Sequence, residues 1–242
     1  MKDNKHEFAL YYPELSLQKQ KKEFSITDQP LIQRIVSVLR LKQGDILTLF
    51  DQRIHVQGKL GACSKKSCSL LVENWHENIH IEPGITVLLP LLKRDAIELA
   101  IYSCVALGAT TIQLVHTEKT RKWQGDKELD RLIRIIIAAA EQSKHFIFPT
   151  INMPIDLVSA LEKYQQIPYK LFAEPNGKKL LKVLEQCDSK QEFVLLVGPE
   201  GDLTSSEKEL LSKEFVSCRL TPTILKSEQA LALLLGTVRL AT

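Results

Sequence analysis

Two different patterns of hydrophobic and polar residues divide the chain. Up to Asn78, apolar residues occur in short β-rich runs at residues 46–50, 53–60 and 67–75, separated by glycine or polar residues. Before these runs, Thr27-Asp28-Gln29-Pro30 is typical of a helix start, and apolar residues follow it at helical spacing. The first part of the chain is therefore predicted to contain one short helix and a small β-barrel-like module.

From Ile85 onward, predicted strands and helices alternate, which is typical of an α/β domain with a mainly parallel sheet. Strands are expected at residues 85–91, 111–116, 169–173, 193–197 and 215–220, and helices at residues 93–107, 127–143, 156–164, 178–185 and 226–240. The last helix is almost entirely apolar, so we expect it to be buried against its domain or a partner subunit. The predicted domains are residues 1–78 and residues 79–242.

Composition limits the kind of protein further. No hydrophobic run approaches the roughly 20 residues of a membrane helix, and the first 25 residues hold many charges in place of a signal-peptide core. We therefore expect a cytoplasmic protein with no membrane partner. The five cysteines are scattered and the histidines lack ligand spacing, which predicts reduced thiols and no metal site. The net charge of +3 comes from the first third of the chain, whose cations are either an RNA-facing surface or an ordinary solvated one.

A glycine-rich turn stands out at residues 195–204, LLVGPEGDLT. A run of β-formers ends at Gly198, and Thr204 and Glu207 have the spacing of a helix capping box, so the pattern predicts a strand, a tight turn and a helix. Gly198 lets a ligand approach bare backbone, and Gly201 tolerates a positive φ. With residues 220–228, LTPTILKSE, this turn favours two loops around one small ligand. Two ordinary turns packed by leucines are the alternative.

Three segments carry a resemblance to a known family: residues 196–201, residues 220–228 and the AAAEQ run at residues 138–142. Over nearly its whole length the chain resembles the 16S rRNA (uracil N3) methyltransferase family, part of the SPOUT class. The resemblance implies a PUA-like RNA-binding barrel, a knotted methyltransferase domain and a homodimer. It also implies S-adenosyl-L-methionine as cofactor and 16S rRNA of the small ribosomal subunit as substrate.

The candidate site residues fall into three groups. Apolar side chains and exposed backbone in three strand-end loops suit an adenosyl group, and the expected cofactor-binding residues are Leu171, Phe172, Ala173, Val197, Gly198, Pro199, Gly201, Leu220, Ile224 and Leu225. Lys226 is the candidate for stabilising negative charge on the uracil oxygens, and Glu228 or Glu200 for accepting the N3 proton. Capping is the alternative role for these residues, because Ser227 and Glu228 suit the start of the last helix. Lys93, Lys119 and Arg121 are the candidate RNA-binding cations.

The chain departs from the family pattern at three positions of these loops. Thr223 and Lys226 stand where the family usually has arginine, and Asp202 stands where it has a second glycine. Lysine lacks the planar fork of arginine. Two alternatives to a uridine methyltransferase therefore stay open: a non-catalytic RNA-binding or ribosome-assembly protein that retains the fold, and a SPOUT-like enzyme with another substrate.

Overall fold

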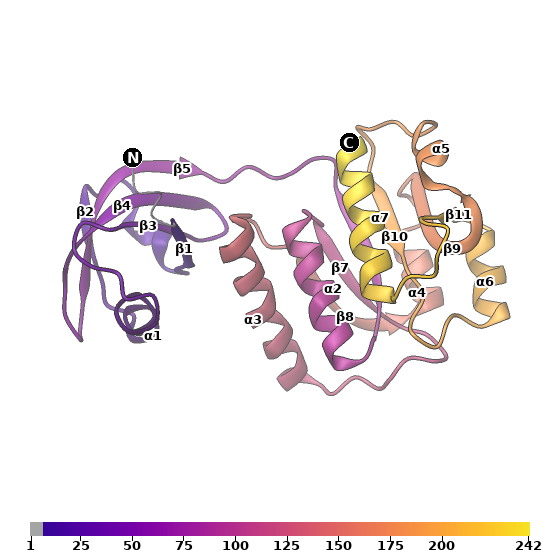
Figure 1. The fold of residues 1–242 in the computed structure, drawn as a ribbon, viewed down its shortest axis with the longest axis horizontal. Coiled ribbons are helices and arrows are strands. Elements are labelled where there is room, and N and C mark those ends of the chain that lie inside the picture. The colour runs from indigo at the N-terminus through magenta and orange to yellow at the C-terminus, as the bar shows by residue number, and fades with distance from the viewer. Residues whose placement is uncertain (1–6) are drawn as a thin grey trace. The chain divides into compact units, whose positions relative to one another are not determined.

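The computed structural model describes residues 7–242, which form two compact units (Figure 1). The first unit holds the chain up to His80 together with residues 140–147, and the second holds residues 81–139 and 148–242. The chain thus returns to the first unit once, within and just after its longest helix.

The first unit is built on a five-stranded sheet in the order β1-β3-β4-β5-β2. Only β1 and β3 pair in parallel. Its elements are β1 (Phe8–Tyr11), η1 (Leu15–Gln18), β2 (Glu23–Ile26), α1 (Gln29–Gln33), η2 (Arg34–Val38), β3 (Ile46–Phe50), β4 (Ile54–Cys63) and β5 (Cys68–Glu77). The predicted helix start is confirmed, because Asp28 accepts a hydrogen bond from the Leu31 amide and Pro30 lies in the first turn.

Residues 140–147 belong to the first unit through ion pairs and aromatic contacts, among them those of Glu141 and Phe146. The Glu141 carboxylate accepts hydrogen bonds from Arg34 Nη1 at 2.8 Å and from the Tyr11 amide at 3.0 Å. The Phe146 ring lies 4.6 Å from that of Phe50. Glu141 belongs to the AAAEQ run, so this part of the motif stabilises the N-terminal unit.

The expectation of five reduced thiols is wrong for one pair, because Cys63 and Cys68 form a disulfide. These two cysteines are five residues apart and lie directly opposite each other where β4 turns into β5. The spacing of the two cysteines in the sequence does not reveal this pairing, because it depends on the tight hairpin that brings them face to face. Cys104 and Cys218 are free and buried, and Cys187 is free and half-buried.

The second unit contains a six-stranded, entirely parallel sheet in the order β11-β9-β10-β6-β7-β8. Its strands are β6 (Ile85–Pro90), β7 (Thr111–His116), β8 (Thr150–Asp156), β9 (Tyr169–Lys179), β10 (Phe193–Leu196) and β11 (Val216–Arg219). Its helices are α2 (Arg94–Ala106), α3 (Asp126–Ser143), α4 (Leu157–Lys163), α5 (Leu180–Leu184), α6 (Ser205–Ser212) and α7 (Ser227–Ala241). The alternating pattern predicted this α/β architecture, but it missed β8 and the second half of β9.

Helices cover the parallel sheet on both faces (Figure 1). On one face, α4 and α6 bury Leu157, Leu161 and Leu211 against strand side chains such as Phe172. On the other, α2 packs against α7, which buries Leu231, Leu234 and Leu235. Across residues 7–242, no helix is both long and apolar enough to cross a membrane.

Candidate functional site

One cavity of about 830 Å³ opens in the second unit, at the carboxyl ends of the central parallel strands. The segments that follow β6, β10 and β11 line it, together with the middle of β9. Strand order reverses between β6 and β10, and ligands of open parallel sheets bind at such a reversal. The volume lies within the range of small-molecule sites.

Most of the predicted cofactor-binding residues line this cavity. They are Ala173, Val197, Gly198, Pro199, Leu220, Ile224 and Leu225. Leu171 and Phe172 do not line it; both are buried in β9 behind the wall. Gly201 lies beside it, where an added Cβ would approach the Lys119 side chain to 3.2 Å. Gly201 therefore packs closely against the Lys119 side chain.

The turn after β10 takes its left-handed residue one position later than expected. Asp202, and not Gly201, has a positive φ of 58°. The Asp202 carboxylate holds the turn by accepting a hydrogen bond from the Leu203 amide at 2.8 Å, and α6 then begins with the predicted capping box between Thr204 and Glu207. Aspartate is among the few side chains that tolerate this conformation, because it bonds to its own backbone.

An ion-pair network joins this turn to β9. Lys208 Nζ lies 2.8 Å from Asp202 Oδ2 and 3.0 Å from Glu174 Oε2, and both carboxylates line the cavity. Burial alone would raise the pKa of Asp202, but the hydrogen bond and charge of Lys208 lower it below its ordinary value. The same bond raises the pKa of Lys208. Asp202, at the position where the sequence departs from the family pattern, thus has an ion-pair partner in Lys208.

The second predicted loop meets the first through Ser227, which sequence reasoning did not assign to the site. The Ser227 hydroxyl donates to the Gly198 carbonyl oxygen at 2.7 Å. Lys226 is the N-cap residue of α7, and Glu228 lies in its first turn. All three candidate catalytic residues, Lys226, Glu228 and Glu200, line the same cavity. Lys226 and Glu228 therefore lie at the start of a helix and also line the cavity.

The start of α2 forms a wall that was not predicted. Arg94, Asp95, Ala96 and Leu99 line the cavity beside Lys93. Glu200 Oε1 accepts a hydrogen bond from the Lys93 amide at 2.9 Å, which links this wall to the glycine-rich turn. The sequence could have predicted this wall only from its position, because these residues directly follow a buried parallel strand, as the two predicted loops do.

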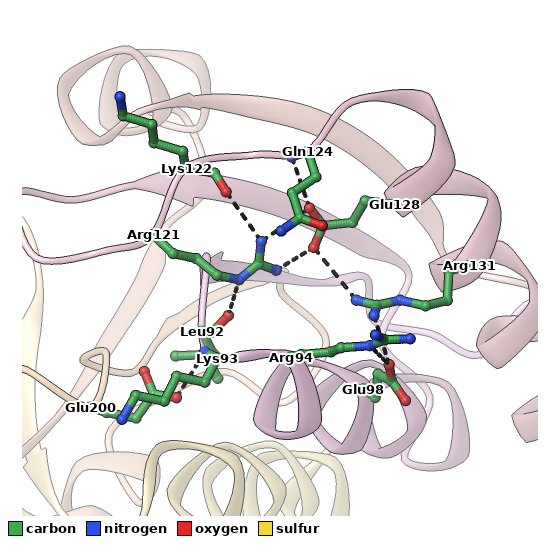
Figure 2. A network of polar contacts seen from close by, with 10 residues as sticks. All are labelled: Leu92, Lys93, Arg94, Glu98, Arg121, Lys122, Gln124, Glu128, Arg131 and Glu200. Carbon is green, nitrogen blue, oxygen red and sulfur yellow. Dashed lines mark hydrogen bonds and ion pairs between the residues drawn. The ribbon is translucent and has the colours of Figure 1, made fainter.

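The three candidate RNA-binding cations are placed differently. Lys93 lines the cavity. Lys119 Nζ donates to the Gly201 carbonyl oxygen at 2.9 Å. The Arg121 guanidinium points into the protein, where it contacts Glu128 and the Leu92 carbonyl oxygen (Figure 2). An RNA-binding role for these residues stays a prediction, and Arg121 has acceptors within the protein.

The chemistry of the cavity is an apolar slot with mixed charges at its edge. Exposed backbone at Gly198 and apolar side chains such as Leu220 and Leu225 face the same space as five carboxylates and three cations, namely Asp95, Glu174, Glu200, Asp202, Glu228, Lys93, Arg94 and Lys226. Across the described residues 7–242, no group of three or more His, Cys, Asp or Glu side chains could hold a metal ion. The arrangement suits a flat apolar ring carried by a charged organic molecule.

Fold and cavity define an α/β protein with a cavity of small-molecule size at the carboxyl edge of a parallel sheet. The family model of the RNA methyltransferase domain matches residues 80–239, and the chain belongs to this family. The match covers all the strands of the second unit, its helices up to residue 239 of α7, and the residues that line the cavity.

Relatives and solved structures agree with this assignment. The chain is 26% identical over 222 residues to the ribosomal RNA small subunit methyltransferase E of Mesomycoplasma hyopneumoniae, covering 90% of this chain and 94% of the relative. It is 28% identical to the protein of the same name from Rickettsia conorii, covering 85% of each. The fold is shared with a Neisseria gonorrhoeae ribosomal RNA small subunit methyltransferase E bound to S-adenosyl methionine, with a TM-score of 0.81 and 24% identity over 96% of both chains. A putative Legionella pneumophila methyltransferase in complex with the same cofactor has a TM-score of 0.80 and 22% identity over 98% of both chains.

Proposed function

We propose that the protein uses S-adenosyl-L-methionine to methylate N3 of one uridine in 16S rRNA of the small ribosomal subunit, in the cytoplasm. The observation that carries the proposal is the cavity, in which both substituted loops and three candidate catalytic side chains meet. Relatives named as small-subunit rRNA methyltransferases, matched over most of their length, support the substrate class.

The residues present fit this cofactor. Leu220, Ile224 and Leu225 offer an apolar slot for adenine, and the backbone at Gly198 is open to the cavity. Carboxylates such as Glu174 suit the ribose hydroxyls or the ammonium group of the methionine part. The bound cofactor would supply an activated methyl group on a sulfonium.

The chain's own task is to align uracil and manage one proton. Uracil N3 is protonated at neutral pH, so its methylation requires a proton acceptor and stabilisation of the charge that spreads to the two carbonyl oxygens. Lys226 supplies the positive charge in this proposal. One oxygen of Glu200 already holds the Lys93 amide, which favours Glu228 as the proton acceptor and Glu200 as a residue that shapes the wall.

Three further parts of the proposal concern the whole chain. We propose residues 1–78 as a PUA-like RNA-binding barrel and residues 79–242 as a knotted SPOUT domain, with Lys93 and Lys119 contacting RNA near the cavity. The excess of cations in the first third of the chain supports the RNA-binding role of that region. We also propose a homodimer, because α2 and α7 pack together and leave Leu99, Leu233 and Leu240 exposed.

The test follows N3-methyluridine in the cell. Mass mapping of small-subunit rRNA from a strain that lacks this protein should show one unmodified uridine, and a plasmid copy should restore the methyl group. Persistence of every N3-methyluridine in that strain would contradict the proposed substrate. Calorimetry with S-adenosylmethionine distinguishes the proposed enzyme from the non-catalytic alternative. The enzyme should bind the cofactor, whereas the non-catalytic protein retains the fold but does not bind it.

A further inference from the structure

Glu128 in the first turn of α3 forms a largely buried ion pair with Arg121 (Figure 2). Arg121 donates from Nη1 to Glu128 Oε2 at 3.0 Å, and its Nη2 contacts Glu128 Oε1. The Glu128 side chain is only 2% exposed, and it also accepts the Gln124 amide at 3.0 Å. Arg131 approaches the same carboxylate at 3.6 Å. The guanidinium is thus fixed in orientation by a two-pronged contact with one carboxylate.

Arg121 also binds the segment just before the cavity wall. Its Nε donates to the Leu92 carbonyl oxygen at 2.6 Å, and its Nη1 also donates to the Lys122 carbonyl oxygen at 3.2 Å. The same peptide unit carries the Lys93 amide, which donates to Glu200 Oε1 at 2.9 Å. One peptide group is therefore held at both ends, by Arg121 on its carbonyl and by Glu200 on its N–H, and it lies immediately before α2.

We propose that Arg121 and Glu128 are a positioning pair for the cofactor site. By fixing the Leu92–Lys93 peptide they hold the amide to which Glu200 binds, and with it the wall formed by the start of α2. Neither Arg121 nor Glu128 lines the cavity, so the pair acts through this peptide. The inference rests on the proposed function, because it assumes that the cavity holds S-adenosylmethionine.

A variant that removes both charges separates positioning from stability. In Arg121→Met/Glu128→Leu the buried pair is replaced by apolar side chains of similar size, a change that is often neutral for stability. The matched control is Lys170→Met/Glu214→Leu in the same unit. There too the cation donates to a carboxylate, at 2.8 Å, and to a backbone carbonyl oxygen, that of Gln165, at 2.7 Å. Neither Lys170 nor Glu214 lines the cavity.

The measurement is calorimetric binding of S-adenosylhomocysteine to the full chain. We expect Arg121→Met/Glu128→Leu to weaken binding about tenfold, which corresponds to the loss of one well-oriented hydrogen bond, with an unchanged melting temperature. The control should bind as the wild type does. Wild-type affinity in the Arg121/Glu128 variant would overturn the inference. A wild-type chain that does not bind at all would instead contradict the proposed function.

A second variant covers the case in which the double substitution does not fold. Arg121→Lys keeps a charge for Glu128 but loses the fork that reaches the Leu92 carbonyl, so it should weaken binding in a folded protein. Glu200→Ala, made alone and with the Arg121 variant, then tests the connection. Because both act on one peptide, their effects should be far from additive. Additive losses would show that Arg121 does not act through this peptide.

Discussion

Asp202 shows how one substituted residue is accommodated by its neighbours. It stands where the related family usually has glycine, and its backbone has a left-handed φ of 58°. A non-glycine residue in this conformation costs about 1–2 kcal/mol. The ion pair with Lys208 and the bond to the Leu203 amide offset this cost, so the substitution leaves the turn intact.

We expect Asp202→Ala to be less stable than Asp202→Gly. Both variants lose the carboxylate and its contact with Lys208, but alanine keeps a Cβ in the left-handed region while glycine does not. The free energy of unfolding should therefore be about 1 kcal/mol lower for alanine, as measured by urea denaturation. Equal stability of the two variants would mean that φ at position 202 is not strained.

Glu228 is the residue on which the proposed chemistry depends most. Glu228→Gln should reduce methyl transfer to small-subunit rRNA by about 100-fold or more, the usual contribution of a positioned base. Binding of S-adenosylhomocysteine should change little. Glu209→Gln on the exposed side of α6 is the control and should keep full activity. Full activity of Glu228→Gln would reassign proton removal to Glu200 or to water.

At the scale of elements, the first turn of α3 is tied by charge to the loop before it, through Glu128 and Arg121. Burial alone would raise the pKa of the Glu128 carboxyl, but hydrogen bonds from Arg121 and the Gln124 amide, with the charges of Arg121 and Arg131, lower it. A lowered pKa means that the ionised carboxylate stabilises the folded state. This contribution is fully present above the ordinary pKa of 4.5 and is lost as the pH falls through the lower, folded value.

The free energy of unfolding of the wild type should therefore fall more steeply in acid than that of the Arg121→Met/Glu128→Leu variant, which has no carboxylate at position 128. Urea denaturation of both proteins from pH 7 down to about pH 3 measures the difference: the free energies of unfolding should be similar at pH 7, and that of the wild type should fall below that of the variant once the pH drops below the ordinary carboxyl range. Lys170→Met/Glu214→Leu provides the comparison for a more exposed pair. Parallel pH curves for the wild type and the Arg121/Glu128 variant would exclude a stabilising ionised Glu128.

At the scale of the whole molecule, exposed apolar side chains on α7 bear on assembly. Leu233 is 39% exposed and Leu240 is 91% exposed, on a helix whose other face packs inside the unit. We expect the chain of 27.4 kDa to elute as a dimer in size-exclusion chromatography with light scattering. Leu233→Lys/Leu240→Lys should shift it to the monomer, because it puts two charges on the proposed contact surface.

The control for this prediction is Val158→Lys. Val158 is 50% exposed but lies on α4, on the opposite face of the sheet from α2 and α7. This variant should keep the dimer. A wild-type monomer at micromolar concentration would contradict a site shared between two copies.

Local chemistry determined most of what the sequence predicted correctly. The alternation of strands and helices after Ile85 determined the parallel α/β architecture, and Thr204 with Glu207 determined the start of α6, because periodicity and capping depend on near neighbours. The glycine-rich turn and residues 220–228 were correctly expected to meet. Both loops follow parallel strands, which places them at the same edge of the sheet.

Tertiary structure alone decided the contacts between distant segments. The Cys63–Cys68 bond depends on a hairpin, and the Asp202–Lys208–Glu174 network depends on how α6 lies beside β9. The hydrogen bonds that Arg121 and Glu200 make to the Leu92–Lys93 peptide group connect residues 92, 121, 128 and 200. No regular sequence spacing predicts these contacts. Such contacts arise from the order of strands in the sheet, and a one-dimensional pattern carries no record of that order.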